Sequence, residues 1–292
     1  MSERRGRRSP PCAGRPDPEP APGRWEAIGI VPYVTNNGFI LSSAPNFRDL
    51  GGHRTAGGGT VRHGLVYRSD ALHAISDEDL PAYNALGIRQ LIDLRTAHER
   101  ERSPDITPEG AAYTAVSVQD PTAAGANFSQ TLLDRERARA VFADGAAERF
   151  MFGVYRELVT DGTALTGYRD LVERAADGPT ALVFHCSAGK DRTGWGAALL
   201  LTLLGVDRSA VVDDYLASNE RQGNTDKWMR RLSEHSGLAW EDIAPMTRVR
   251  AEYLQSAFGH IDEVYGSFDG YVFDGLGLSS ETVDALRARM VA

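Results

Sequence analysis

The sequence predicts an α/β domain in which helices lie on both faces of a mainly parallel central sheet. Between residues 65 and 204, short apolar segments alternate with longer segments of helical periodicity. This alternation is typical of domains built from parallel strands and crossover helices. From residue 209 onward the periodicity is helical, which predicts a helical C-terminal part.

Four segments are expected to form strands because they are short, apolar or alternating, and bounded by turn or polar residues. They are residues 65–68, 90–94, 113–118 and 181–184. The glycines at 51, 52, 57, 58 and 59 are predicted to lie in hairpin turns.

Helices are predicted from apolar spacing and from their start and stop signals. Residues 76–79 (Ser-Asp-Glu-Asp) are similar to a capping box and precede a helical stretch that stops at Gly87. Helical spacing also marks residues 142–159, 168–176 and 193–204. The last of these is apolar on nearly all sides, so we expect it in the core.

The N-terminal residues differ in composition from the rest of the chain. Residues 1–24 are rich in Arg, Pro and Gly, which predicts a disordered tail ahead of a single domain over residues 25–292. The chain has a net charge of −8, and the tail contributes +3 through six arginines and three acidic residues, which leaves −11 for the domain. An acidic domain argues against nucleic acid as the main ligand.

Several features bear on location. The longest apolar run, around residues 194–206, is shorter than the ~20 residues that a membrane helix needs. The first eleven residues lack the apolar stretch of a secretory signal, so we expect a cytoplasmic protein, with export by an unconventional route as the alternative.

The two cysteines, Cys12 and Cys186, do not suggest a disulfide framework.

The loop at residues 185–194 (His-Cys-Ser-Ala-Gly-Lys-Asp-Arg-Thr-Gly) is the main candidate for chemistry. It joins a predicted strand to a predicted helix, and anions bind at such junctions in α/β sheets. Ala188 and Gly189 are small enough for consecutive backbone N–H groups to converge, and Arg192 offers a planar fork for two phosphate oxygens. The helix start, the amides and the cations Lys190 and Arg192 favour the thiolate form of Cys186.

Two other interpretations of the loop fit its residues less well. Gly189-Lys190 is similar to the end of a Walker A motif, but Asp191 replaces the required Ser or Thr and Phe184 the first Gly. A buried, inert core cysteine is the usual fate of a free thiol, but cationic loop neighbours disfavour it.

The loop resembles the Cys-x5-Arg-Ser/Thr signature of tyrosine and dual-specificity phosphatases. Further segments resemble, in order, landmarks of the bacterial tyrosine phosphatase family that includes the secreted mycobacterial and listerial enzymes. These segments are residues 46–52 (Asn-Phe-Arg-Asp-Leu-Gly-Gly), 67–70 (Tyr-Arg-Ser-Asp), 92–95 (Ile-Asp-Leu-Arg), Asp214-Tyr215 and Ser218-Asn219. The resemblance implies the tyrosine phosphatase α/β fold and activity on phosphotyrosine, with phosphoserine, phosphothreonine and phosphoinositides as further substrates.

The resemblance and the chemistry together suggest roles for individual residues. Cys186 is expected to be the nucleophile and Arg192 the phosphate ligand. Thr193 either donates to the leaving thiolate or caps the helix. His185 is expected to brace the loop, because it points to the side of the strand away from Cys186. The expected phosphate-binding residues are Ser187, Ala188, Gly189, Lys190, Asp191, Arg192 and Thr193. The expected supporting residues are His185, Asn46, Arg48 and Asp49. Asp49 could instead serve only to form a turn.

The general acid is ambiguous. Asp93 ends a predicted strand at the ligand-binding edge and Asp191 lies in the loop itself, whereas Asp120 and Asp134 lie in a segment that could form a lid. We favour Asp93 over Asp191, although a salt bridge with Arg95 would give Asp93 a purely structural role.

Neither a metal nor a cofactor is expected, because no His, Cys or Asp cluster has metal-ligand spacing. The chain is therefore predicted to be a phosphatase acting on a phosphorylated protein or a phosphoinositide through a phosphocysteine intermediate. The alternatives are a non-catalytic phosphate-binding or scaffolding protein and a thiol enzyme of another reaction.

Overall fold

The computed structural model describes residues 41–123, 125, 128–178, 180–221 and 223–292. The predicted tail, the start of the domain at residue 25 and Cys12 lie outside these residues. The five strands are β1 (Arg48–Asp49), β2 (Val66–Ser69), β3 (Ile88–Asp93), β4 (Ala112–Ala115) and β5 (Ala181–His185). They form one sheet in the order β1-β2-β5-β3-β4, in which only the β1–β2 pairing is antiparallel. The prediction of a mainly parallel sheet is confirmed.

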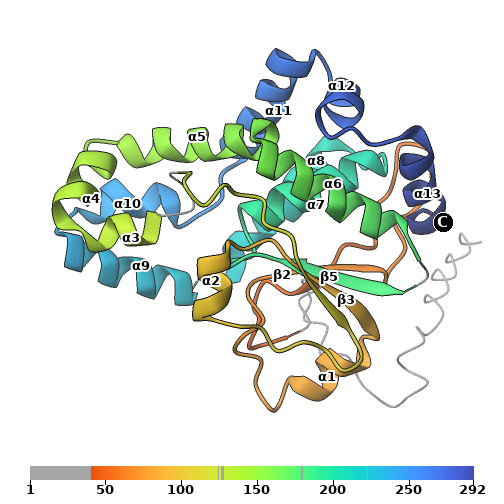
Figure 1. The fold of residues 1–292 in the computed structure, drawn as a ribbon, viewed down its shortest axis with the longest axis horizontal. Helices are drawn as coiled ribbons and strands as arrows, with labels where there is room; N and C mark the ends of the chain where they lie inside the picture. Colours follow the sequence, from red (N-terminus) through yellow and green to blue (C-terminus); the bar gives the residue numbers. More distant parts are fainter. Residues whose placement is uncertain (1–40, 124, 126–127, 179, 222) are drawn as a thin grey trace, which may run out of the picture. The chain divides into compact units, whose positions relative to one another are not determined.

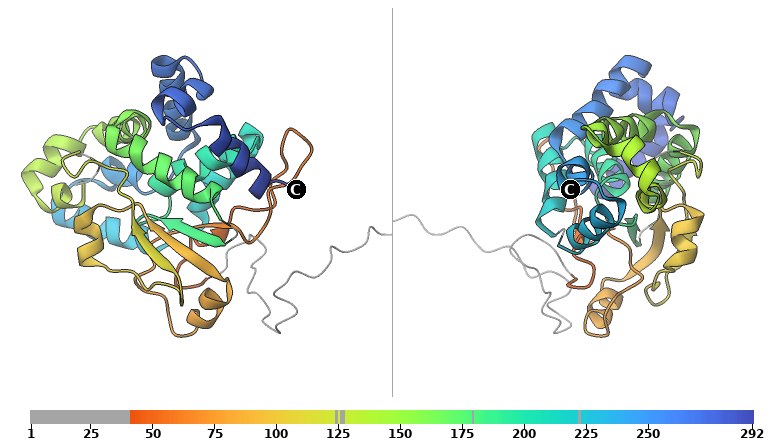
Figure 2. Two further views of the ribbon diagram at one scale, coloured as in Figure 1. Left: turned by 45° about the vertical axis from the view of Figure 1, so that its right-hand side comes forward. Right: turned by 90° about the vertical axis from the view of Figure 1, so that its left-hand side faces the viewer.

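The helices are α1 (Leu80–Ala85), α2 (Ala97–Arg102), α3 (Phe128–Leu133), α4 (Arg135–Phe142), α5 (Ala146–Thr160), α6 (Gly162–Ala176), α7 (Arg192–Leu203), α8 (Arg208–Ala217), α9 (Gly223–Ser236), α10 (Trp240–Ile243), α11 (Ala251–Tyr265), α12 (Phe268–Gly270) and α13 (Ser280–Met290). Shorter turns of helix are η3 (Ser218–Arg221), η4 (Ala244–Met246) and η5 (Tyr271–Gly275). Helices α6, α7 and α8 lie on one face of the sheet and α1 on the other (Figure 1). Figures 1 and 2 place α11 on the side of this helical layer that faces away from the sheet.

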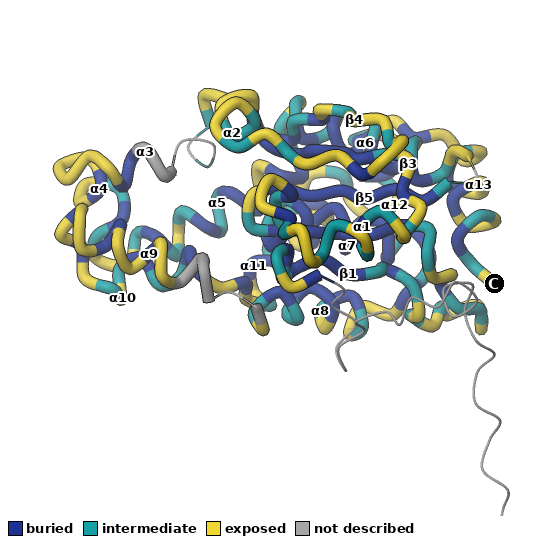
Figure 3. The backbone as a smooth tube through the Cα atoms, turned by 90° about the horizontal axis from the view of Figure 1, so that it is seen from below, coloured by how far each residue is buried: buried dark blue, intermediate teal, exposed yellow. Residues whose placement is uncertain are grey.

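Strand β5 shows why its segment is apolar at every position. Leu182 and Phe184 belong to the larger hydrophobic core, whereas Ala181 and Val183 belong to a smaller core on the opposite face. Successive side chains of a strand point to opposite faces, so a strand with helices on both sides buries both sets. Figure 3 shows β5 in the buried centre of the molecule and α4 and α9 largely exposed.

Helix α7 is buried around its circumference, as predicted. Trp195 and Leu199 are both fully buried, and the chain leaves the helix through Gly205, whose φ of +79° favours glycine. Among the described residues, no helix is both long and apolar enough to cross a membrane.

Two helix predictions are wrong in detail. The expected helix at residues 142–159 is interrupted between α4 and α5, where Asp144 and Gly145 have φ values of +55° and +73°. The expected capping box at residues 76–79 is only half formed. Asp79 donates its backbone N–H to Ser76 Oγ, but its carboxylate accepts from Ser43 instead of the backbone of Ser76.

Candidate active site

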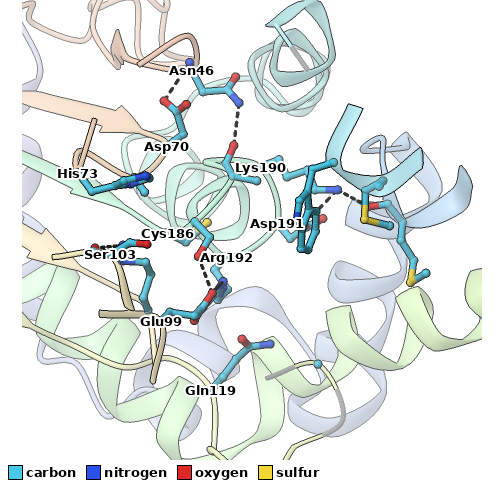
Figure 4. A pocket seen from close by; sticks show the side chains of 18 of the residues that line it. Asn46, Asp70, His73, Glu99, Ser103, Gln119, Cys186, Lys190, Asp191 and Arg192 are labelled. Carbon is cyan, nitrogen blue, oxygen red and sulfur yellow. Dashed lines mark hydrogen bonds and ion pairs between the residues drawn. The ribbon is translucent and has the colours of Figure 1, made fainter. Parts of the chain in front are cut away.

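The loop that follows β5 lies at the floor of a cleft of about 650 Å³. Cys186 comes directly after β5 and is 2% exposed. Its side chain lines the cleft together with Lys190, Asp191 and Arg192, as Figure 4 shows. The parallel strands β2, β5 and β3 end on this side, so the sheet topology places the loop where an α/β fold binds ligands.

Gly189 gives the loop its tight path. Its φ is +67°, and a Cβ at this position would lie 2.6 Å from the backbone nitrogen of Asp70. Asn46 Nδ2 donates to the carbonyl of Ala188 (2.8 Å), and Arg68 Nη2 donates to that of Gly189 (3.0 Å). The C=O and the N–H of a trans peptide unit point in opposite directions. The backbone N–H groups of Gly189 and Lys190, which share peptide units with these two carbonyls, therefore point away from Asn46 and Arg68.

A buried ionic network lies behind the loop, and we call Arg48, Arg68 and Asp214 the rear network. Arg48 Nε lies 3.0 Å from Asp214 Oδ1 and Arg68 Nη1 2.5 Å from Asp214 Oδ2. Burial would raise the pKa of Asp214, but the two guanidinium groups outweigh it and hold this pKa well below its usual range. Burial and the like charge of Arg48 lower the pKa of Arg68 to about 10.

Arg192 and Glu99 form a second ion pair that lines the cleft, which we call the front pair. Nη1 and Nη2 of Arg192 each donate to one oxygen of Glu99 at 2.7 Å. Glu99 also completes a capping box with Thr96 at the start of α2, and it accepts from Ser187 Oγ at 2.5 Å. Although burial favours the neutral acid, Arg192 holds the pKa of Glu99 well below its usual range.

Asp93 is at the predicted strand end, but its carboxylate does not line the cleft. Both of its oxygens accept from Arg95 Nε, at 2.9 and 3.1 Å, and the hydroxyl of Tyr113 donates to it at 2.8 Å. Its side chain is 0% exposed. Burial would raise the pKa of Asp93, but the hydrogen bonds from Arg95 and the charge of His185 lower it further than burial raises it.

Asp191 lies at the cleft and is held by tyrosines. The hydroxyl of Tyr155 donates to Asp191 Oδ1 at 2.9 Å and lies 2.6 Å from the hydroxyl of Tyr215. Burial and the nearby Asp191 raise the pKa of Tyr155 well above its usual value, so this hydroxyl remains a neutral donor. Asp120 and Asp134 instead bind local backbone N–H groups, of Thr122 and Arg137 respectively.

Three further predicted residues, Lys190, Thr193 and Asp49, have separate surroundings. Lys190 is buried, and its ammonium donates to the carbonyl of Met246 and lies 3.6 Å from Asp191. Thr193 is also buried, and its Oγ1 has no hydrogen-bond partner among the residues that the structure describes. Asp49 accepts from the backbone of Gly51 and Gly64, as a turn residue would.

His185 contacts the start of the loop and approaches two carboxylates. Nδ1 lies 3.0 Å from the carbonyl oxygen of Cys186, and Nε2 lies 3.1 Å from Asp105 Oδ2 and 3.9 Å from Asp93 Oδ1. The three side chains resemble a metal-ligand cluster. However, Arg95 Nη2 donates to both carboxylates, at 2.7 and 2.5 Å, so a guanidinium already supplies the positive charge that a metal would bring.

Three residues near the site were missed by sequence reasoning: Glu99, Asp105 and Tyr155. A fourth, Asp70, lies in the family landmark at residues 67–70 but was given no role of its own. Asp70 lines the cleft and accepts from the backbone N–H of Asn46 at 3.1 Å, and burial raises its pKa to about 7. Of the three that were missed, only Glu99 had a usable signal, because Thr96-Ala97-His98-Glu99 has capping-box spacing. Asp105 and Tyr155 act through contacts with distant parts of the chain.

The walls of the cleft differ in chemistry. One wall is apolar and is formed by Phe150 and Met151 of α5, Trp228 and Met229 of α9 and Met246 of η4. The other carries the polar side chains His98, Glu99 and Arg102 of α2. A ligand that reaches Cys186 therefore passes between an apolar and a charged surface.

Comparison with known proteins assigns the chain to a family. A model of the tyrosine phosphatase family matches residues 39–292. The triple specificity protein phosphatase PtpB of Mycobacterium tuberculosis is 32% identical over 275 residues, covering 85% of this chain and 96% of PtpB. A protein of Cupriavidus necator, provisionally named a tyrosine-protein phosphatase, is 35% identical over 239 residues, covering 82% of this chain and 84% of its own.

A solved structure is a more distant match. The crystal structure of TpbA from P. aeruginosa covers 65% of this chain and 89% of TpbA, with 12% identity and a TM-score of 0.29. The family model spans all but the first residues of the chain, in agreement with the resemblance seen in the loop, and the chain therefore belongs to the tyrosine phosphatase family.

Proposed function

We propose that this protein hydrolyses phosphotyrosine through a phosphocysteine intermediate on Cys186. The observation that carries the proposal is the placement of the Cys186 thiol at the floor of a cleft that Arg192 also lines. Membership of the tyrosine phosphatase family supports the same reaction. The reactive group and the anion ligand thus lie in one loop, at the edge of the sheet where anions bind.

In the first step the thiolate of Cys186 attacks phosphorus, so that an S–P bond forms as the P–O bond to tyrosine breaks. Two N–H groups of Arg192 bind Glu99, and the other three remain for phosphate oxygens. The loop amides stabilise the charge that spreads over these oxygens. The phenolate oxygen that leaves takes a proton from a carboxylic acid.

We assign this proton to Asp191 rather than to Asp93, which sequence reasoning favoured. Asp191 lines the cleft and is oriented by Tyr155, whereas the carboxylate of Asp93 is enclosed by Arg95 and Tyr113. A general acid must reach the leaving oxygen, and access to the cleft favours Asp191.

In the second step water attacks the phosphocysteine. Asp191, now ionised, takes a proton from this water, the S–P bond breaks, and inorganic phosphate is released. The departing thiolate of Cys186 would accept a hydrogen bond from Thr193, whose buried hydroxyl has no other partner among the described residues.

The reaction is tested with para-nitrophenyl phosphate in the presence of EDTA. We expect full turnover with the chelator and none in Cys186→Ser, which should still bind inorganic phosphate. Phosphate binding without turnover in the wild-type protein would instead indicate the scaffolding alternative. Activity that EDTA removes would contradict a metal-free mechanism.

The general acid is tested by varying the leaving group. Because a poor leaving group depends more on protonation, Asp191→Asn should lose at least tenfold more activity on phenyl phosphate than on para-nitrophenyl phosphate. Asp93→Asn should reduce both rates by a similar factor. The reverse pattern would return the role to Asp93, and the same selective loss in Asp70→Asn would assign it to Asp70.

The substrate range is proposed to extend beyond phosphotyrosine. PtpB is named a triple specificity phosphatase, and the cleft places Arg102 and His98 on the wall beside the loop. A second anionic group on a phosphoinositide could pair with Arg102. We therefore propose phosphoproteins and phosphoinositides as substrates. Arg102→Ala should reduce turnover of a phosphoinositide at least fivefold more than that of a phosphotyrosine peptide.

A further inference from the structure

The hydroxyl groups of Tyr155 and Tyr215 form a buried chain that ends on Asp191. Tyr155 belongs to α5 and Tyr215 to α8, and both residues are 0% exposed. The two hydroxyl oxygens lie 2.6 Å apart, and that of Tyr155 lies 2.9 Å from Asp191 Oδ1. Two helices that are distant in the sequence thus bring hydroxyl groups to the side chain that we assign as the general acid.

The ring of Tyr155 is held by aromatic packing. Its edge meets Tyr215, with ring centroids 6.2 Å apart and an interplanar angle of 84°, and it lies tilted against Tyr253 at 5.7 Å and 31°. Gly194 in the first turn of α7 leaves room for Tyr215, because a Cβ there would lie 2.9 Å from the Tyr215 ring. Closely packed side chains keep one rotamer, so the Tyr155 hydroxyl stays directed at Asp191.

The hydrogens of this chain have one consistent direction. A hydroxyl has a single hydrogen, so Tyr155 can donate to only one of the two oxygens that it faces. An ionised carboxylate can only accept, which assigns this hydrogen to Asp191 and makes Tyr215 the donor to Tyr155. A backbone hydrogen bond from Arg250 to the oxygen of Tyr215 continues the same direction.

This direction determines which oxygen of Asp191 carries the proton used in catalysis. Because Oδ1 accepts from Tyr155, the proton of the neutral acid resides on Oδ2. A general acid must keep its proton within reach of the leaving oxygen, and rotation of the carboxyl group would exchange the two oxygens. Lys190 Nζ lies 3.6 Å from Oδ2, so its charge also offsets the negative charge that remains there after proton transfer.

We infer that Tyr155 is a positioning residue that fixes Asp191 for proton transfer through Oδ2, and that Tyr215 fixes the donor direction of Tyr155. The inference rests on Asp191 as the general acid of the proposed function. Neither tyrosine lines the cleft, so both would act through Asp191. If the hydroxyls instead served only to satisfy each other in the core, their removal would affect all substrates equally.

The test compares the rates of Tyr155→Phe, which loses the hydroxyl but keeps the ring, on phenyl phosphate and para-nitrophenyl phosphate. We expect a loss about fivefold larger on phenyl phosphate, because the poorer leaving group depends more on the proton. The inhibition constant of inorganic phosphate, which has no leaving group to protonate, should stay within about twofold of wild type. In an Asp191→Asn background, Tyr155→Phe should change the ratio of the two rates by less than about twofold.

The matched control is Tyr253→Phe. Tyr253 packs against the same ring, but its hydroxyl donates to the carbonyl of Pro245 at 3.2 Å. Its ratio of the two rates should therefore equal that of the wild type. The same selective loss in Tyr253→Phe as in Tyr155→Phe would overturn the inference, because it would trace the loss to packing in the tyrosine cluster.

Two further outcomes would also overturn the inference: equal losses of Tyr155→Phe on both esters, and an undiminished selective loss in the Asp191→Asn background. If Tyr155→Phe does not fold, Tyr215→Phe decides. A selective loss of about twofold on phenyl phosphate supports the inference, and an unchanged ratio overturns it. A wild-type protein that hydrolyses neither ester would overturn the proposed function and this inference together, whereas an active wild type with unselective variants overturns this inference alone.

Discussion

The rear network and the front pair both join guanidinium groups to a carboxylate, but they differ in access. In the rear network the side chains of Arg48, Arg68 and Asp214 are 5%, 0% and 6% exposed. In the front pair Arg192 is 11% exposed and Glu99 26% exposed, and both line the cleft. The rear network is therefore suited to holding the shape of the loop, whereas the front pair orients the guanidinium that we propose binds the phosphate.

The largest expected effect concerns the rear network. Asp214→Asn leaves two buried arginines without their carboxylate, so we expect a loss of about 3–5 kcal/mol in the free energy of unfolding, measured by urea denaturation. The folded state lowers the pKa of Asp214. Its contribution is therefore present above the unfolded pKa of about 3.9 and is lost as the pH falls towards the lower folded value. If the difference in the free energy of unfolding between the wild type and Asp214→Asn does not become smaller below about pH 4, this prediction is wrong.

A smaller but still large effect is expected for the front pair. Arg192→Lys should lower kcat/KM about 100-fold, or about 2.7 kcal/mol in barrier terms, because an ammonium lacks the planar fork that binds both oxygens of Glu99 and grips phosphate in the bidentate way. Arg192→Ala should be little worse. Arg137→Lys, an exposed position on α4, serves as the control. A lysine variant within tenfold of wild type would show that charge alone suffices.

The carboxylate of the front pair should matter less than the guanidinium. Glu99→Gln keeps the size of the side chain but removes the charge that orients Arg192, so we expect kcat to fall about tenfold, or about 1.4 kcal/mol. Glu101→Gln on the same helix is exposed and should leave kcat unchanged. Equal effects of the two variants would show that Glu99 only caps α2.

The smallest effect is expected for an exposed ion pair on α6. Arg174 and Asp170 form an ion pair of 2.9 Å one turn apart on α6, but the two side chains are 35% and 34% exposed. Solvent screens such a pair, so Asp170→Asn should change the free energy of unfolding by less than about 0.5 kcal/mol. A loss comparable to that of Asp214→Asn would mean that access does not govern these energies.

How far the sequence could predict the site depends on the separation of the partners. The loop with Cys186 and Arg192 is contiguous, so spacing and composition sufficed to find it. Glu99 lies 93 residues from Arg192, and its capping-box spacing with Thr96 can indicate a helix start but not the ion pair. The end of β3 was also predictable, but spacing could not show that Arg95 encloses the carboxylate of Asp93. In residues 142–159 the apolar spacing continues across the break at Asp144, because spacing reports burial and not backbone dihedrals.

The capping box of α2 has a consequence for how substitutions in this protein would be interpreted. Thr96 does not line the cleft, yet its backbone N–H and hydroxyl hold the carboxylate that orients Arg192. In an unbiased mutational screen, replacements at Thr96 would therefore appear among the inactivating changes although the residue never meets substrate. A protein engineer who exchanges this buried threonine to adjust the start of the helix would, on the proposed function, alter the affinity for phosphate as well.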